Sequence, residues 1–257
     1  MPTDFIFYAA AIPAVILVGL SKGGLGGAFA MMGVPILTLV IPPVQAAAIM
    51  LPILIVMDMA GLWVWRHYND SQTLKIMLPG AIIGIGIGWL TAEFVTADMI
   101  RLIVGVISIA FVMRYLYDRF RSRARQDVEA GRQNVVKGSF WGTVSGFTSF
   151  VTHAGGPPFQ IYALPLRLDP RTYNGTSIRY FTVVNALKVL PYFALGQFDA
   201  SNLTTSAVLL PLAPLATFAG AWIVKRMRAE VFYPLMYFMI LATAVKLVAD
   251  GLNGLFG

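Results

Sequence analysis

The sequence predicts an all-α polytopic membrane protein made of two inverted-topology repeats, each with about five hydrophobic segments and a short helix broken by glycine. Three observations lead to this fold class: the apolar composition, the spread of apolar segments along the chain, and the alternation of basic loops. Of the 257 residues, 58% are hydrophobic and only 12% are charged, whereas about 25% are charged in a soluble domain. Lipid is therefore the expected solvent for a single transmembrane domain over residues 1–257.

Ten apolar segments cover the chain from end to end. A helix needs about 20 apolar residues to cross a bilayer. Two of the segments, 25–41 and 157–168, are too short to cross comfortably, and each begins beside glycine or proline. Segments 5–21 and 25–41 form either full spans or a re-entrant hairpin, and both alternatives stay open. The ten segments are residues 5–21, 25–41, 44–65, 74–92, 97–117, 136–152, 157–168, 172–196, 203–224 and 229–251.

The central loop 118–135 separates two halves, residues 1–117 and 136–257. A constant shift that matches Gly26 with Gly156 brings the glycine break, the short segment and a buried charge of each half into the same order. Each half has an odd number of crossings under either alternative, so the halves run in opposite directions, as is typical of secondary transporters. The same shift matches Phe29 with Phe159, Pro35 with Pro165, and Asp58 with Lys188.

Basic residues fall in alternate loops, which places those loops on one side of the membrane. The positive-inside rule assigns that side, and with it the central loop, to the cytoplasm, so that both termini face outward. This distribution accounts for the net charge of +7, and no nucleic-acid partner is expected. The basic loops are 66–75, 118–135, 167–171 and 225–228, and the connections without lysine or arginine are 41–43, 92–98 and 197–203.

The residue types needed for most catalytic chemistry are scarce. The chain has no cysteine and two histidines, which leaves no disulfide, no thiol nucleophile and no Cys-ligated metal. No phosphate-binding Walker motif is present. We therefore expect no enzyme activity, no cofactor and no metal.

Two stretches carry specific glycine motifs. Residues 19–53 read GLSKGGLGGAFAMMGVPILTLVIPPVQAAAIMLPI, and residues 146–193 read GFTSFVTHAGGPPFQIYALPLRLDPRTYNGTSIRYFTVVNALKVLPYF. Together with the length and the two-half layout, they resemble the TauE/SafE family of sulfite and organosulfur-anion exporters. The resemblance implies export of sulfite or a related small anion across a bacterial inner membrane, with about eight crossings. The outward-facing termini predicted from the loop charges would then lie in the periplasm.

The two glycine stretches are the first candidate binding elements. A helix that begins inside the membrane directs its amide groups and the positive end of its dipole at a site, which suits an anion. We expect such starts at about Gly24–Gly27 and at about Gly155–Pro158, facing each other near the midplane. Close helix packing through small residues is the alternative reading. The candidate glycines are Gly23, Gly24, Gly26, Gly27, Gly155 and Gly156.

Two ionisable residues stand beside these stretches. Lys22 either lies deep in the membrane and balances the charge of the anion, or is a lysine at the cytoplasmic rim. His153 is either a proton carrier, for which its unperturbed pKa near 6.5 is suited, or a structural histidine. The neighbouring Thr152 is a candidate hydroxyl donor to an oxyanion.

Segment 172–196 is unusually polar. Asn174, Ser177, Asn185 and Lys188 share one helical face by their spacing, and Arg179 lies off that face, near the cytoplasmic end. A charge inside the membrane calls for a partner or a function. Asp58 is the expected partner of Lys188, either as a structural pair or as a group that titrates during transport. Ser177 and Asn185 are further candidate donors to the anion.

These residues together predict a secondary transporter that exports a small anion by alternating access. Its expected partners are the anion and the lipid bilayer, with a homodimer as an alternative to the monomer. Two other classes remain: an accessory subunit that stabilises a partner, and an intramembrane enzyme. Proton coupling and simple uniport are both open, and the identity of the anion is not fixed by the residues.

Overall fold

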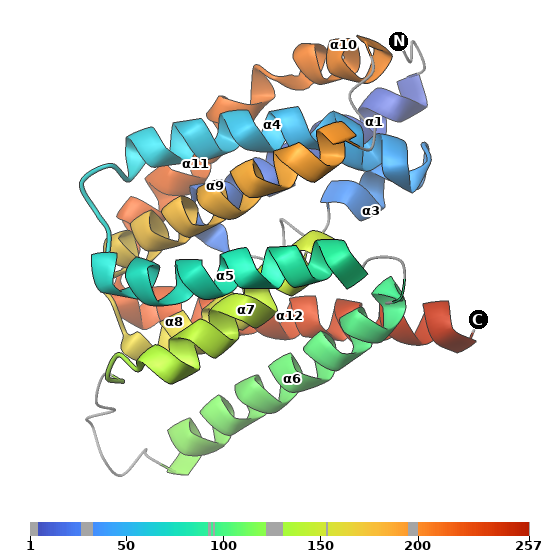
Figure 1. Cartoon of the computed structure of the whole chain (residues 1–257). Coiled ribbons are helices and arrows are strands. Elements are labelled where there is room, and N and C mark those ends of the chain that lie inside the picture. The colour runs from blue at the N-terminus through green and yellow to red at the C-terminus, as the bar shows by residue number, and fades with distance from the viewer. Residues whose placement is uncertain are drawn as a thin grey trace. The chain divides into compact units, whose positions relative to one another are not determined.

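The computed structural model describes residues 5–26, 33–91, 94, 96–121, 131–152, 154–194 and 200–256. Within these residues the chain is helical and contains no strand, which confirms the all-α prediction (Figure 1). Each of the ten predicted segments contains at least one helix. The helices are α1 (Phe5–Leu20), the π-helical turn η1 (Ser21–Leu25), α3 (Gly33–Leu37), α4 (Pro43–Val64), α5 (Ser71–Thr91), α6 (Ala97–Arg121), α7 (Val135–Thr152), α8 (Gly156–Ala163), the 3-10 turn η3 (Leu164–Leu166), α9 (Pro170–Ala194), α10 (Ala200–Leu209), α11 (Leu212–Lys225) and α12 (Ala229–Phe256).

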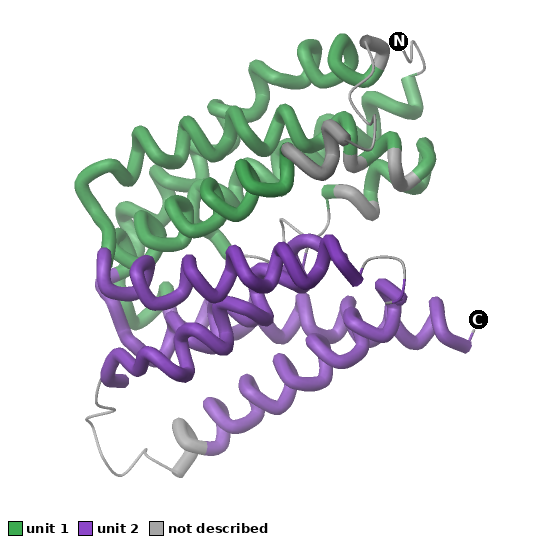
Figure 2. The backbone as a smooth tube through the Cα atoms, viewed as in Figure 1, with its two compact units in different colours: residues 1–70, 170–232 green, residues 71–169, 233–257 purple. Residues whose placement is uncertain are grey.

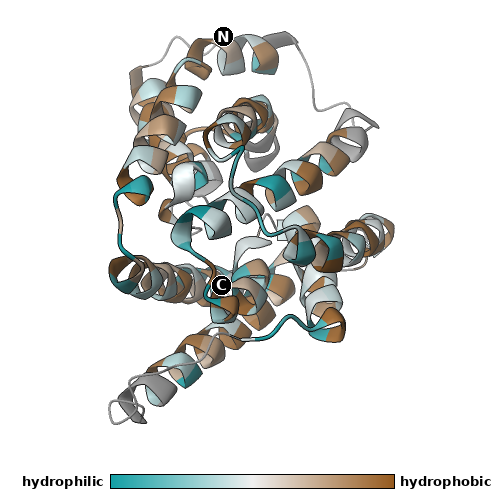
Figure 3. Ribbon diagram, turned by 90° about the vertical axis from the view of Figure 1, so that its left-hand side faces the viewer, coloured by the Kyte–Doolittle hydropathy of each residue, from teal (hydrophilic) through white to brown (hydrophobic). Residues whose placement is uncertain are grey.

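Several helices are long and apolar enough to cross a membrane. Four such spans occur in the described chain, over Phe5–Leu25, Ser71–Thr91, Ala97–Tyr117 and Ala229–Phe256. Helices α10 and α11 add a fifth if they form one span, bent by 44°. Large apolar side chains are exposed on these helices, as expected where lipid is the solvent. In Figure 3 the helices are largely brown (hydrophobic), and the teal colour gathers in connecting segments. The chain is therefore a multi-pass membrane protein.

The chain packs into two compact units, which are coloured separately in Figure 2. Unit 1 comprises Met1–Asp70 and Pro170–Phe232, and unit 2 comprises Ser71–Asp169 and Tyr233–Gly257. Unit 1 thus contains α1, α3, α4, α9, α10 and α11, whereas α5, α6, α7, α8 and nearly all of α12 belong to unit 2. Each unit draws helices from both predicted halves of the sequence.

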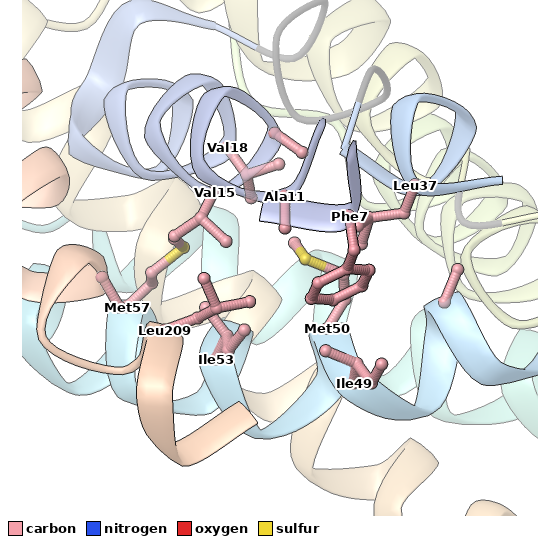
Figure 4. Packing of buried hydrophobic residues seen from close by; sticks show 13 residues of the cluster. Phe7, Ala11, Val15, Val18, Leu37, Ile49, Met50, Ile53, Met57 and Leu209 are labelled. Carbon is pink, nitrogen blue, oxygen red and sulfur yellow. The ribbon is translucent and has the colours of Figure 1, made fainter. Parts of the chain in front are cut away.

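An apolar cluster joins α1, α3, α4 and α10 in unit 1 (Figure 4). Phe7, Ala11 and Val15 recur at every fourth position of α1, so they lie on one face of that helix. Ile53 and Met57 of α4 are fully buried in the same cluster. Because lipid tails are as apolar as these side chains, close van der Waals packing is what holds the helices together. This packing fixes α4, which carries part of the candidate site, against α1.

Glycine allows the closest helix approach in each unit. In unit 2, a Cβ atom on Gly84 of α5 would overlap the carbonyl oxygen of Thr143 in α7, and one on Gly146 of α7 would overlap the carbonyl oxygen of Ala81. In unit 1, a Cβ atom on Gly220 of α11 would overlap the carbonyl oxygen of Leu20 at the end of α1. Small residues at such positions let helix backbones touch in lipid, so α5 packs tightly on α7, and α11 on α1.

Candidate functional site

The first glycine stretch breaks the helix that begins at Phe5. Ser21–Leu25 form a π-helical turn at the end of α1, and the φ angles of Gly24 and Gly26 are 131° and 99°. Residues with a side chain rarely adopt such angles, whereas glycine does so readily. The hydroxyl of Ser21 donates a hydrogen bond to the carbonyl of Gly26 and closes the turn. The predicted break is therefore at the glycines.

The predicted helix start at Gly24–Gly27 is wrong for the residues described. Positive φ angles at Gly24 and Gly26 are incompatible with a right-handed helix, and Ser21–Leu25 extend α1. The next described helix, α3, begins at Gly33. Gly27 lies outside the described residues.

Three helices of unit 1 enclose the break. A Cβ atom on Gly24 would lie 2.8 Å from Oδ1 of Asn174 in α9, and Gly23 packs on the backbone of α11. Nε1 of Trp65, at the end of α4, donates a hydrogen bond of 3.2 Å to the carbonyl oxygen of Gly23. The indole of Trp65 thus satisfies one carbonyl of the interrupted backbone, which has no partner in lipid, and Asn174 of α9 packs against Gly24.

Lys22 forms an ion pair with Asp58 beside this break. Nζ of Lys22 lies 2.6 Å from Oδ1 of Asp58, and Nδ2 of Asn185 donates a 2.7 Å hydrogen bond to Oδ2. The side chains of Lys22 and Asp58 are 12% and 3% exposed. Lys188 is 2% exposed and interacts electrostatically with both Lys22 and Asp58. We call these four residues the charge cluster.

The cluster differs in one respect from the predicted pairing. The sequence reading paired Asp58 with Lys188, whereas the hydrogen bonds recorded for the Asp58 carboxylate come from Lys22 and Asn185. Lys188 belongs to the same cluster, and its direct pairing with Asp58 stays a prediction. Asp58 lies one to two turns before the end of α4 at Val64, or about 9 Å by helix rise, so Lys22 is drawn into the interior of unit 1.

Arg179 holds the end of α4 from α9. Nη1 donates to the carbonyl oxygens of Trp65 and Tyr68 at 3.1 and 2.7 Å, and Nη2 donates to that of Arg66 at 2.7 Å. Nη1 also contacts the carbonyl of Gly175 at 2.8 Å, one turn earlier in α9. The first three of these carbonyls belong to the turn that directly follows α4 at Val64, where a cation also complements the helix dipole. Arg179 therefore caps α4 through this turn and fixes the residue that binds Gly23.

Sequence reasoning missed the roles of Arg179 and Trp65. Trp63, Trp89 and Trp222 are exposed, as in a tryptophan belt at a membrane interface, whereas Trp65 is fully buried. No periodicity separates Trp65 from Trp63, because the difference arises from the turn that ends α4. The position of Arg179 off the polar face of its helix was the one available signal.

The second glycine stretch lies in unit 2. Helix α8 begins at Gly156, with Pro157 and Pro158 in its first turn, as predicted. Proline suits this position because no amide donor is needed there. Oγ of Ser145 donates to the carbonyl of Gly155 at 2.7 Å, which ties the start of α8 to α7. Gly155 is also close to Ser149, where a Cβ atom would lie 2.7 Å from the Cβ of the serine.

The remaining predicted residues are placed as follows. The hydroxyl of Thr152 donates to the carbonyl of Thr148 at 3.0 Å, so its proton is used within α7. Ser177 is half-buried on α9, and the side chain of Asn174 donates to the carbonyl of Pro170 at 2.8 Å. His153 lies outside the described residues. The structure thus gathers Lys22, the glycines of the first stretch and the charge cluster in unit 1, and places Thr152, Gly155 and Gly156 in unit 2.

The chemistry of the charge cluster suits a small anion. The cluster holds two ammonium groups and one amide that can donate hydrogen bonds, and one carboxylate that can accept them. Hydrogen bonds from a charged donor to an anion are the short and strong ones. Among the described residues, no group of three or more His, Asp or Glu side chains could hold a metal ion.

An all-helical multi-pass fold with buried charges beside a glycine break is the architecture of a membrane transporter. The model of the sulfite exporter TauE/SafE family matches residues 11–247, and the chain belongs to that family. Comparison with curated proteins gave no match, and comparison with solved structures gave none either. The family predicted from residues 19–53 and 146–193 is therefore confirmed over nearly the whole chain.

Proposed function

We propose that this protein is a secondary transporter that exports sulfite or a related organosulfur anion across the bacterial inner membrane by alternating access. The observation that carries the proposal is the charge cluster: the buried Lys188 and the largely buried Lys22 meet one buried carboxylate beside a broken helix. With both lysines protonated, the cluster carries one surplus positive charge. A monovalent anion would neutralise that surplus, which reduces the cost of keeping charge in the membrane.

In this mechanism Asp58 forms the ion pair with Lys22 while no anion is bound. An arriving oxyanion competes with the carboxylate for the ammonium group of Lys22 and gains a second contact from Lys188. The amide of Asn185 holds the displaced Asp58, so the carboxylate keeps one charge-stabilising hydrogen bond at 2.7 Å. Binding then exchanges one ion pair for another and neutralises the surplus charge of the cluster, and release restores the pair of Lys22 with Asp58.

Two helix pairs support the proposed inverted repeat. The shift that matches Gly26 with Gly156 also matches α1 with α7, and α5 with α10 together with most of α11. The tight pair α1–α11 in unit 1 is thus the counterpart of the tight pair α7–α5 in unit 2. In each pair, the first helix of one half packs on the fourth segment of the other. Such reciprocal packing of helices from the two halves is expected of an inverted repeat.

The driving force needs no coupling ion. An inside-negative potential drives an anion outward by about 2.3 kcal/mol per charge per 100 mV. In the proposed orientation, the loop 118–135 lies in the cytoplasm and both termini lie in the periplasm. If protons are coupled, Asp58 and His153 are the candidates.

Flux in proteoliposomes tests the proposal. Purified protein in vesicles with an imposed potassium diffusion potential should move labelled sulfite, or a small sulfonate, toward the positive side. Collapse of the potential should slow the flux if transport is uniport. Intact protein that moves no small anion on its own would favour the accessory-subunit class, and a chemically altered sulfur compound would favour the enzyme class.

A further inference from the structure

The ends of α4 and α11 in unit 1 carry a second cationic feature, separate from the charge cluster. We propose that this end binds the headgroup of an anionic phospholipid, with an acyl chain along the exposed apolar strip beside it. The inference does not depend on the transported anion. It rests on two arginine–tryptophan stacks, on the contact that joins them, and on the balance of charge around them.

Each arginine lies over a tryptophan of its own helix end. The guanidinium carbon of Arg226 lies 3.9 Å from the ring centroid of Trp222, and that of Arg66 lies 5.0 Å from the ring centroid of Trp63. Both tryptophans are more than half exposed, at 59% and 63%. An exposed indole beside a cation is the arrangement that settles at a membrane interface, and stacking holds the guanidinium there.

The two stacks lie on neighbouring helices. Trp63 of α4 meets Phe218 of α11 edge-to-face, with ring centroids 5.9 Å apart. Both helices run toward this end of unit 1 (Figure 1). Arg66 stacks over Trp63 itself, and Arg226 stacks over Trp222, which follows Phe218 by four residues, or about 6 Å along α11. The two cations are thus brought to one part of the surface, above one aromatic contact.

The guanidinium groups keep donors for a ligand. Nη1 of Arg66 and Nη1 of Arg226 donate to the carbonyls of the tryptophans they cover, at 3.3 and 3.2 Å, and Nε of Arg66 donates to Nε2 of His67 at 3.0 Å. The Nη2 group of each arginine has no role in these hydrogen bonds. A guanidinium has five N–H donors in a planar fork that matches phosphate oxygens. Stacking on the indole fixes the plane of each fork, so less rotamer freedom is lost when a phosphate binds.

The surrounding charge selects an anionic headgroup. Exposed Lys225, Arg228 and Arg171 extend the cationic surface around the stacks, against the acidic residues Asp70 and Glu230. A surface of this sign attracts anionic lipids, and it offers no carboxylate cluster for the choline of a zwitterionic lipid. On the lipid side of the stacks, exposed apolar side chains form a strip that an acyl chain can cover: Met59, Trp63, Leu215, Phe218 and Ile223.

Native mass spectrometry of the full-length protein in detergent tests the proposal. The probes are phosphatidylglycerol, phosphatidylcholine with the same acyl chains, and inorganic phosphate. The variant is R66Q/R226Q, and the matched control is K75Q/K137Q, which removes the same charge from exposed positions of unit 2. We expect retained phosphatidylglycerol in the wild type and the control, and roughly thirtyfold weaker binding in R66Q/R226Q, since each interfacial cation contributes about 1 kcal/mol.

Three results would overturn the proposal: equal retention of phosphatidylglycerol by R66Q/R226Q and the wild type, equal retention of phosphatidylcholine by the wild type, or displacement of the lipid by inorganic phosphate at matched concentration. Circular dichroism and the melting temperature of R66Q/R226Q, measured without lipid, show whether the variant is folded. Both arginines are exposed, so we expect a melting temperature close to that of the control. If the double variant is not folded, the single variants R66Q and R226Q should each weaken binding by about fivefold, and unchanged binding in both would also contradict the site.

Discussion

Nζ of Lys22 lies 2.6 Å from Oδ1 of Asp58, so the lysine of the glycine break and the carboxylate of α4 form one buried ion pair. Desolvation of two charges is costly, and such a pair persists only when hydrogen bonds satisfy its remaining atoms. Asn185 supplies one such bond, and the ring of Phe181 lies 5.9 Å from the Lys22 ammonium. The pair therefore ties the end of α1 to α4 and α9.

This arrangement predicts an asymmetry between the two partners. Asp58→Asn should lower the free energy of unfolding by about 3–5 kcal/mol, because two buried lysines then lose their counter-charge. Lys22→Met should cost less, because Lys188 remains as a counter-charge for Asp58. Melting temperatures of the detergent-purified variants give the order, and anion flux should fall in both.

The double variant Lys22→Met/Asp58→Asn separates stability from transport. Its stability should return toward that of the wild type, because the cluster keeps its net charge and the asparagine carbonyl still accepts from Asn185. Flux should not return, since the lysine that binds the anion is absent. Wild-type flux in the double variant would show that Lys22 has a structural role alone.

The parts of the fold that could be predicted are those that the bilayer restricts. A helix that crosses a bilayer must be long and apolar, and glycine or proline marks where it breaks, so the helix pattern and the start of α8 at Gly156 followed from the sequence. The bend between α10 and α11 was missed within the predicted segment 203–224. The two compact units were missed as well, because close packing such as that of Gly84 on Thr143 joins residues far apart in sequence.

The site was predictable in its residues and less so in its contacts. Lys22, Asp58, Asn185 and Lys188 stood out because charge and amide groups are costly in lipid. Which lysine meets Asp58 depends on the π-helical turn, which directs Lys22 toward α4, and no local pattern reports that turn. Arg179 binds main-chain carbonyls. Every residue has such a carbonyl, so no pattern of residue types identifies the partners of Arg179.

Glycine packing in unit 2 predicts opposite effects at two positions of one helix. Gly84→Ala should destabilise by about 1–3 kcal/mol, because its Cβ would overlap the carbonyl of Thr143 and push α5 from α7. Gly86→Ala should be neutral or stabilising by up to about 1 kcal/mol, because its Cβ would meet open space and alanine favours a helix. Thermal unfolding of the two variants in one detergent compares them directly, and equal melting temperatures would contradict the close α5–α7 contact.

The cap formed by Arg179 predicts that lysine cannot replace it. A single ammonium group cannot reach the carbonyls of Trp65, Arg66 and Tyr68 in the geometry of the planar fork. Arg179→Lys should therefore cost about 2–3 kcal/mol, the range of one or two hydrogen bonds to a charged group. Arg171→Lys is the matched control, because Arg171 is exposed and its contacts with Tyr68 and Lys225 are long, at 3.3 and 3.2 Å. If Arg179→Lys lowers the free energy of unfolding no more than Arg171→Lys does, Arg179 does not stabilise the end of α4.

The start of α8 offers the cleanest separation of binding from folding. A Cβ atom on Gly156 would meet no atom within 4 Å, and its φ angle is not positive, so Gly156→Ala should leave the melting temperature within about 1 °C of the wild type, as expected where no contact changes. If the first amides of α8 line the anion path, the added methyl group should raise the KM for sulfite several-fold with little change in maximal flux. Gly26→Ala is the contrasting variant: the φ angle of Gly26 is 99°, so alanine should lower stability by about 1–2 kcal/mol through backbone strain. An unchanged KM in a folded Gly156→Ala protein would remove the start of α8 from the anion path and leave the charge cluster of unit 1 as the binding site.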